Sequence, residues 1–235
     1  RVFVEFPLLN GKQYLEKNPE AWPINEMGER APPADWFMGI CPTDPGFRQY
    51  RFQQLQTLLQ NFEIDGIWLD YVHWHAQFET SDPILPETCF CERCTTTFER
   101  QMEIKVPEGN TTSRAAWILG ESDSLWRVWR SKILTDWVSE MKIALNDKRP
   151  KALLGIFHCS WYPSDFDKAL HRKLGINLNE LSGIVDVFSP MLFHRMMDRP
   201  VEWVHEYVEW LNELPVPGNG KKPSIWPLVQ AHNHP

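Results

Sequence analysis

The sequence contains neither a long apolar run nor a cluster of basic residues. No stretch of about 18 apolar residues occurs, so no segment is expected to span a membrane. The 24 Lys and Arg residues are scattered among 31 Asp and Glu residues, which gives a formal net charge of -7. Nucleic acids and acidic membrane surfaces select clustered positive charge, so neither is expected as a partner.

Two kinds of catalytic signature are also missing. No Gly-rich turn follows an apolar run, which argues against the phosphate-binding turn of a doubly wound sheet. The closely spaced pair His73-x-His75 is unspecific, so metal-dependent hydrolysis is a weak alternative. No cofactor is therefore expected for catalysis. Tryptophan, in contrast, is abundant, with 12 residues. Because indole rings stack on sugar rings as well as filling cores, a carbohydrate ligand is mildly favoured.

Short apolar runs alternate with amphipathic helical runs along the chain. The apolar runs predict strands at 2–9, 36–41 (short), 64–72, 152–159, 184–193 and 224–230. They are apolar almost throughout, as in strands of a parallel sheet that is covered on both faces. Helical periodicity predicts helices over 46–62, 122–147 and 200–214. This order predicts a parallel α/β fold.

The lengths of the connections favour a (β/α)8 TIM barrel. The connections that follow strands are long, at 10–35, 73–121 and 160–179, whereas most of those that precede strands are tight. In such a barrel the first kind builds the functional face. We therefore expect a single barrel domain over 1–235. Because the chain starts and stops beside predicted strands, we expect a barrel that is incomplete at both ends. A targeting leader would lie upstream, so no compartment is assigned.

Two carboxylates lie at opposite ends of the predicted strand 64–72. Asp65 follows the preceding helix, at the end of the barrel where polar residues connect turns, and is interpreted as structural. Asp70 lies at the carboxyl end, where the active sites of barrels are found. Because side chains alternate along a strand, Gly66, Trp68 and Asp70 share one face, which directs Asp70 toward the barrel mouth. The alternative is that Asp70 caps a loop or a helix start.

The segment 41–48 (CPTDPGFR), a helix and the segment 62–71 (FEIDGIWLDY) together resemble the glycosyl hydrolase-like barrel families. The segments 126–130 (WRVWR) and 186–193 (DVFSPMLF) also fit their pattern, and the resemblance covers about residues 2–230. It implies that Asp70 is a catalytic carboxylate, the nucleophile or its equivalent. It also implies that the strands present are the third to the seventh of the barrel and that 36–41 is a loop segment.

Hydrolysis of a glycosidic bond normally requires a second carboxylate. Glu5 is the first candidate, because it lies late in strand 2–9, and Asp165, which follows the strand 152–159, is the second. Three acids of the loop after Asp70 could also reach back: Glu79, Asp82 and Glu87. The alternative for each loop acid is a solvated surface charge. The sequence leaves the partner of Asp70 open.

Polar and aromatic residues follow several predicted strands, and we interpret them as a substrate-binding set. A single histidine near a barrel mouth is more often a structural hydrogen-bonding group, but several such residues converge here. Trp74 or Trp161 would provide the stacking platform. The predicted substrate-binding residues are His73, Trp74, His158, Trp161, His194 and Gln230.

The sequence Cys89-x-Cys91-x-x-Cys94 places three thiols within six residues, and Cys41 is a plausible fourth ligand. The arrangement is similar to the four-cysteine zinc site of the family 42 β-galactosidases, although the acid/base Glu of their fourth strand is replaced by Asp70. Four thiolates complete the tetrahedron and leave no position for water, so such a zinc ion would be structural. The alternative is a set of buried or disulfide-linked cysteines. Cys159 is expected to be free and buried.

These observations favour a glycoside hydrolase that cleaves O-glycosidic bonds of an oligo- or polysaccharide, with Asp70 as the essential carboxylate. The alternative is a non-catalytic carbohydrate-binding barrel module, which would show no second carboxylate within about 10 Å of Asp70.

Overall fold

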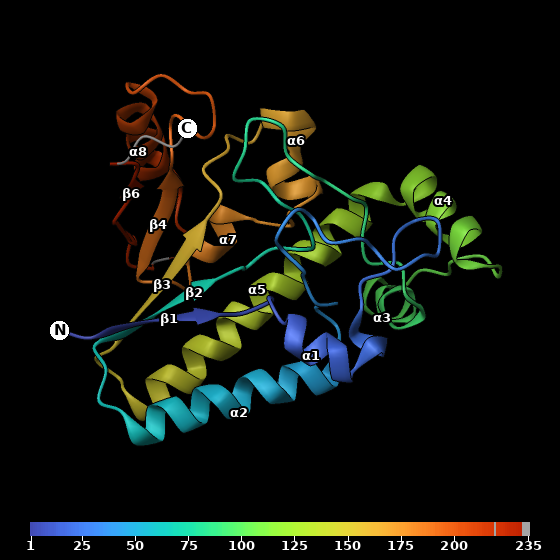
Figure 1. Cartoon of the computed structure of the whole chain (residues 1–235), viewed down its shortest axis with the longest axis horizontal. Coiled ribbons are helices and arrows are strands. Elements are labelled where there is room, and N and C mark those ends of the chain that lie inside the picture. Colours follow the sequence, from blue (N-terminus) through green and yellow to red (C-terminus); the bar gives the residue numbers. More distant parts are fainter. Residues whose placement is uncertain (219, 232–235) are drawn as a thin grey trace.

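A parallel β-sheet forms the centre of the protein. The structure, a computed structural model, describes residues 1–218 and 220–231. The strands are β1 (Phe3–Pro7), β2 (Gly66–Asp70), β3 (Leu153–His158), β4 (Val187–Leu192), β5 (Ser224–Ile225) and β6 (Leu228–Val229). They are ordered β1-β2-β3-β4-β5, β6 also pairs with β4, and all pairs are parallel. The predicted parallel α/β fold is therefore confirmed. Within the described residues β1 and β5 do not pair, so the sheet is open and the closed barrel remains a prediction (Figure 1).

The helices lie between the strands in sequence. They are α1 (Lys12–Lys17), the 3-10 turn η1 (Pro19–Ala21), α2 (Pro45–Asn61), α3 (Glu92–Met102), α4 (Thr111–Glu121), α5 (Asp123–Lys148), α6 (Asp165–Arg172), α7 (Leu178–Ser182) and α8 (Trp203–Glu213). The predictions for α2, α5 and α8 are confirmed, whereas the others lie in segments expected to be connections or turns. The run 36–41 forms no strand, only isolated bridges, as the family resemblance implied. The predicted strand 224–230 is divided into β5 and β6.

Helices α2 and α5 pack along one side of the sheet (Figure 1). Helix α2 begins at Pro45, where the side chain of Asp44 accepts a hydrogen bond of 2.8 Å from the backbone N–H of Phe47. This cap satisfies one of the free N–H groups of the first turn. The long helix α5 buries Trp137 and Met141, and Trp137 donates from Nε1 to the carbonyl of Pro42 at 2.8 Å. The start of α2 is thus fixed by its own cap and by α5.

The face of the sheet that carries Trp68 and Gly155, called the inner face below, is covered by aromatic rings. Trp68 stacks on Trp226 with centroids 5.3 Å apart, and its Nε1 donates to the hydroxyl of Ser189 at 2.8 Å. A Cβ atom at Gly155 would lie 2.3 Å from the Trp68 ring, so the indole lies directly over that glycine. The side chain of Asp65, at the opposite end of β2 from Asp70, accepts from the N–H of Val2 at 2.6 Å. Asp65 thus connects β1 to β2, and Asp70 follows Trp68 on the inner face.

Candidate functional site

A pocket that is partly open to solvent and has about 320 Å³ of space between its walls, the open part included, lies at the carboxyl end of β2. It is formed by the segment before α2, by the end of β2 with the loop that follows it, and by β4. The residues that line it are Trp36, Phe37, Asp70, Tyr71, His73, Ala76, Gln77, Phe78, Glu79 and Met191. The predicted centre of the site, Asp70, is thus a wall residue of a cavity, together with a second carboxylate, Glu79.

The Asp70 carboxyl has an unusually high pKa. Burial raises the pKa to about 6, the backbone N–H of Tyr71 opposes this by donating to Oδ1 at 2.8 Å, and the charge of Glu5 raises it further. Glu5 itself is exposed on the neighbouring strand β1, where it pairs with Trp68. A carboxyl with a pKa of about 6 can hold or release a proton close to neutral pH. Asp70 therefore has the titration behaviour of a general acid or base.

Glu79 is electrostatically coupled to Asp70. Burial raises its pKa, and so does the charge of Asp70. Its loop has a fixed shape, because the backbone N–H and C=O groups of Gln77 and Ile84 pair with each other at 3.0 and 2.9 Å. This bridge encloses Glu79 in a short loop against the cavity. The coupled carboxyl pair of the cavity is therefore Asp70 and Glu79.

The other loop acids and Asp165 have different environments. Glu87 accepts hydrogen bonds from Arg127 at 2.7 and 2.9 Å and is also paired with Lys173. Although burial opposes it, the bonds from Arg127 hold the pKa of Glu87 at about 2, so this carboxylate anchors the loop to α5. Asp82 is exposed. Asp165 accepts from the backbone N–H of Tyr162 at 2.9 Å and from Arg199 at 2.8 Å, at the start of α6.

The exposed aromatic ring of the cavity is Trp36, which is 55% exposed. It packs edge-on against Tyr71 at 5.9 Å, and Tyr71 stacks on Phe37 at 5.3 Å with an interplanar angle of 7°. The predicted platforms were different residues, Trp74 and Trp161. These rings are 0% and 1% exposed, so they are core residues, and that prediction is corrected. Trp74 even donates from Nε1 into the core, to the carbonyl of Arg130 at 3.1 Å.

Sequence reasoning missed Trp36 because its segment was assigned to a short apolar strand. The preceding residues 32–35 (PPAD) are a turn signal that could have identified a loop there. The structure shows how this loop is held: His75 Nδ1 accepts from the N–H of Gly39 at 3.1 Å, and Nε2 lies 2.7 Å from the carbonyl of Pro32. Because a carbonyl can only accept, the hydrogen of this imidazole is on Nε2. His75 is therefore a structural bridge between the loop after β2 and the loop that carries Trp36.

Among the predicted polar residues, His73 alone lies in the cavity with Asp70. Its Nδ1 is 2.8 Å from the carbonyl of Trp74, which places the ring hydrogen on Nδ1. Burial lowers its pKa to about 4, so the imidazole is neutral and Nε2 is an acceptor. His158 instead packs against Phe188 and Tyr207 on the opposite face of the sheet, and burial lowers its pKa to about 4 as well.

The two remaining predicted substrate-binding residues, His194 and Gln230, lie together in a separate hollow that includes Val204 and Val208 of α8. The side-chain oxygen of Gln230 accepts from the backbone N–H groups of Arg195 and Met196, at 3.1 and 3.3 Å. Gln230 thus supports the turn after β4. The structure does not bring these two residues into the Asp70 cavity.

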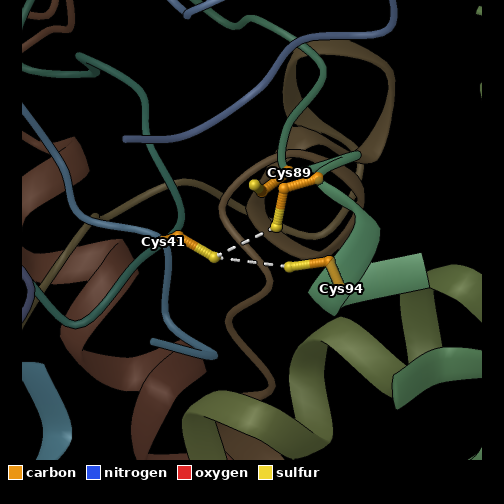
Figure 2. Close-up of side chains that lie close together, drawn as sticks. Cys41, Cys89 and Cys94 are labelled. Carbon is orange, nitrogen blue, oxygen red and sulfur yellow. Dashed lines mark hydrogen bonds between the residues drawn. The ribbon is translucent and has the colours of Figure 1, made fainter. Parts of the chain in front are cut away.

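The four predicted metal-ligating cysteines converge. The sulfur atoms of Cys41, Cys89, Cys91 and Cys94 all lie within 4.8 Å of one another, and all are free thiols. Cys41 Sγ is 3.8 Å from Cys91 Sγ and 3.4 Å from Cys94 Sγ. Figure 2 shows the Cys41 thiol, from the segment before α2, facing the thiols of Cys89, from the segment that leads into α3, and of Cys94, from the first turn of α3. A tetrahedral zinc ion with bonds of about 2.3 Å holds its sulfur ligands about 3.8 Å apart. The cluster is thus placed to bind a metal ion such as zinc.

Polar groups surround the cluster in the manner of an outer ligand shell. The N–H of Ile24 donates to Cys89 Sγ at 3.3 Å, and the Thr43 hydroxyl lies 3.2 Å from both Cys41 and Cys94. Hydrogen bonds with the neighbouring thiols hold the pKa of Cys41 well below its usual range, whereas burial raises that of Cys89. The guanidinium of Arg93, which is paired with Asp44 at 3.1 Å, adds a positive charge nearby. The surrounding groups thus favour the anionic, metal-binding form of Cys41, whereas burial raises the pKa of Cys94 as it does that of Cys89.

The comparisons with known proteins concern the fold. No protein-family model and no curated protein matches the sequence. The glycoside hydrolase domain of PgaB (BpsB) from Bordetella bronchiseptica is similar in structure, with a TM-score of 0.63 and 14% identity over 88% of this chain and 56% of that one. A β-galactosidase from Bacillus circulans sp. alkalophilus has a TM-score of 0.57 and 13% identity, covering 85% of this chain and 31% of that one. The β-galactosidase from the psychrophilic Marinomonas ef1 has a TM-score of 0.57 and 9% identity, covering 83% of this chain.

This chain therefore shares its fold with glycoside hydrolases and spans about half of the length of the first neighbour and about a third of the others. In the described part of the chain, no helix has the length and apolar character needed to cross a membrane.

Proposed function

We propose that this protein is a glycosidase that cleaves O-glycosidic bonds and that Asp70 and Glu79 are its two carboxylates. The observation that carries the proposal is their coupling within one cavity: the charge of Asp70 raises the pKa of Glu79. The glycoside hydrolases that share the fold support the same reaction class. Of the two partners favoured from sequence, Glu5 raises the pKa of Asp70 through its charge but is not part of the cavity wall, and Asp165 is paired with Arg199. We therefore prefer Glu79, which lines the cavity.

The coupled pair suits the protonation state that the reaction requires. When two carboxyl groups interact, the loss of the first proton makes the loss of the second harder, so over a range of pH the pair holds a single proton. Glycosidic cleavage uses this state, with one carboxylic acid and one carboxylate on either side of the bond. The N–H of Tyr71 donates to Asp70 and favours its charged form. We assign Asp70 as the carboxylate that attacks or activates water, as the resemblance to the glycosyl hydrolase-like barrels implies, and Glu79 as the acid that protonates the leaving oxygen.

The rest of the cavity suits a sugar. Trp36 offers an exposed indole, and the neutral His73 offers Nε2 as an acceptor for a sugar hydroxyl group. Flat apolar faces with a few fixed polar groups are the usual composition of a carbohydrate-binding site. The stacking role that the sequence assigned to Trp74 and Trp161 thus passes to Trp36.

We also propose that the cysteine cluster holds a structural zinc ion. The ligands would be Cys41, Cys89, Cys91 and Cys94, which complete the tetrahedron without water. The ion would connect the segment before α2 to the segment that leads into α3. Both segments continue directly into walls of the Asp70 cavity, so the ion would support the site without taking part in the reaction.

We propose that the open sheet is part of a (β/α)8 barrel domain. Its curvature supports this, because Phe3 of β1 and Trp226, which follows β5, are in ring contact at 5.9 Å. Further strands would then pair with the outer edges of β1 and β5 to complete the barrel around the inner aromatic face.

The test of the proposed activity compares two aspartates of the same strand. Asp70→Asn should lower turnover of aryl glycosides or polysaccharides by about 10²–10⁴-fold without changing the circular dichroism spectrum. Asp65→Asn, at the structural end of β2, should leave turnover unchanged. Full turnover by the Asp70→Asn protein would overturn the proposal. Sugar binding by the wild type without turnover of any glycan would favour the non-catalytic binding module instead.

A further inference from the structure

The amide oxygen of Gln77, a residue in the wall of the Asp70 cavity, is left without a hydrogen-bond donor by the protein. Its side chain is 6% exposed and lines the cavity, and Oε1 is buried with no hydrogen bond. Of the two polar atoms of this amide, Oε1 is the one that is fully buried and unpaired. Buried amides in folded proteins are nearly always hydrogen-bonded, because an unpaired group retains its full desolvation cost. A buried amide oxygen without a donor therefore needs an explanation outside the fold.

The backbone of Gln77 shows that its position is not accidental. Both of its main-chain groups pair with Ile84, at 3.0 and 2.9 Å, so the residue lies at the fixed end of the loop that carries Glu79. The neighbouring side chains in the cavity, Ala76 and Phe78, are buried and apolar and offer the amide no polar group. The loop thus holds an unsatisfied amide oxygen in place beside the carboxylate pair.

We propose that Gln77 is a substrate-binding residue that selects for one hydroxyl group of the sugar bound beside Asp70 and Glu79. This inference rests on the proposed glycosidase function. A hydroxyl group both donates and accepts, so it can bond to either end of the amide, whichever end the terminal torsion turns toward the ligand. A site built to bond a hydroxyl discriminates strongly against an analogue that lacks it, because the polar group of the site then stays unpaired.

The structure offers a matched control in Gln101. Its Oε1 accepts from Nε1 of the fully buried Trp129 at 2.7 Å, so this amide has a structural partner. Gln77→Met should keep or raise the melting temperature, because it removes an unpaired buried amide oxygen and preserves the volume. Gln101→Met should lower the melting temperature, because it leaves the Trp129 N–H without an acceptor.

The experiment measures binding of galactose, glucose and N-acetylglucosamine, and of their monodeoxy derivatives, by calorimetry. For the parent sugar that binds, Gln77→Met should raise Kd about tenfold, while Gln101→Met leaves it unchanged. One deoxy derivative should bind the wild type and Gln77→Met equally, which identifies the selected hydroxyl. The proposal is overturned if Gln77→Met binds the parent as tightly as the wild type, if no deoxy derivative removes the difference, or if none of the three sugars binds.

Failure of this inference is distinguishable from failure of the proposed function, because these measurements need no turnover. Full activity of Asp70→Asn together with a hydroxyl selected by Gln77 would refute the reaction and retain the binding site. Loss of activity in Asp70→Asn, with no effect of Gln77→Met on binding, would support the proposed reaction and refute the role of Gln77 in binding.

Discussion

The rings of Phe3 and Trp226 lie 5.9 Å apart, although β1, which carries Phe3, and β5, which precedes Trp226, are at opposite edges of the sheet. The sheet is therefore strongly curved. The ring of Trp68 contacts both, at 4.8 and 5.3 Å, and fills the hollow side of the curve. Asp70 lies two residues beyond Trp68 on the same face, so the curvature directs its carboxyl toward the cavity.

Gly155 should be essential to this curvature. A methyl group there would lie 2.3 Å from the Trp68 ring, so Gly155→Ala must displace the indole and should lower the free energy of unfolding by about 1–3 kcal/mol. Gly120, in α4, is the matched control because nothing lies within 4 Å of its added Cβ. Gly120→Ala should be neutral or stabilising by up to about 1 kcal/mol. Urea denaturation measures both, and equal effects would contradict this interpretation.

The pKa of Asp70 predicts a rise of activity with pH. If Asp70 acts as the carboxylate, kcat/KM should increase as the pH rises through about 6, where Asp70 loses its proton. Removing the charge of the exposed neighbour with Glu5→Gln should move this limb to lower pH, because the Glu5 charge raises the pKa. The pH profiles of the wild type and the Glu5→Gln protein test both points. An unchanged limb would show that another group controls it.

The Asp70 proton should also make the stability of the folded protein fall as the pH rises, whereas the activity rises. The pKa of Asp70 is raised on folding from 3.8 to about 6, so the folded state binds the proton more tightly than the unfolded chain. The stabilisation that Asp70 gives the folded state by binding this proton is therefore fully present below pH 3.8 and is lost as the pH rises to about 6. The melting temperature of the wild type relative to Asp70→Asn should fall across this range. Subtracting the variant removes the contribution of Glu87, whose lowered pKa acts with the opposite sign.

The cysteine cluster should bind one zinc ion per chain. Cys94→Ser should lose the metal and lower the melting temperature, because the segments on either side of the cavity are then no longer connected. Cys159→Ala is the control, since Cys159 is buried and lies outside the cluster. Elemental analysis with thermal melts measures the outcome. A protein that contains no zinc, or zinc that survives in Cys94→Ser, would refute the assignment.

Truncation of Trp36 and of Trp74 should have different effects on sugar affinity and on stability. Trp36→Ala removes an exposed ring, so it should weaken sugar binding while changing stability by no more than about 0.5 kcal/mol. Trp74→Ala removes a fully buried ring and should cost about 3–5 kcal/mol. Calorimetric binding and chemical denaturation separate the two effects. Unchanged affinity in Trp36→Ala would remove this residue from the site.

The sequence predicts those features that depend on local pattern. The apolar runs predict β1 to β4 and the amphipathic stripes predict α2, α5 and α8, because periodicity and burial are linked residue by residue. Three of the four cysteines are also a local pattern, because they lie within six residues, and Cys41 was added to them as a plausible fourth ligand. Asp70 was assigned to the inner face by the alternation of side chains, and it lines the cavity.

The sequence does not predict features that depend on how loops fold back. Nothing near Glu79 distinguishes it from Glu87, yet Arg127 and Lys173 neutralise only Glu87 and leave Glu79 beside Asp70. Trp74 follows a strand end, as a binding residue would, but its ring is turned into the core by its bond to Arg130. These outcomes depend on contacts between residues far apart in sequence, which a single chain does not reveal.

The cysteine cluster has a geometric consequence for the cavity. Trp36 and Phe37 lie four to five residues before Cys41, while Glu79 and Gln77 lie on the chain that leads to Cys89. Two opposing walls of the cavity therefore originate from one small cluster of sulfur atoms. If the cluster holds the proposed ion, the four sulfur positions would fix the point from which both segments run to the cavity. A change at the cluster should then alter the spacing of these walls and the ligands that fit between them.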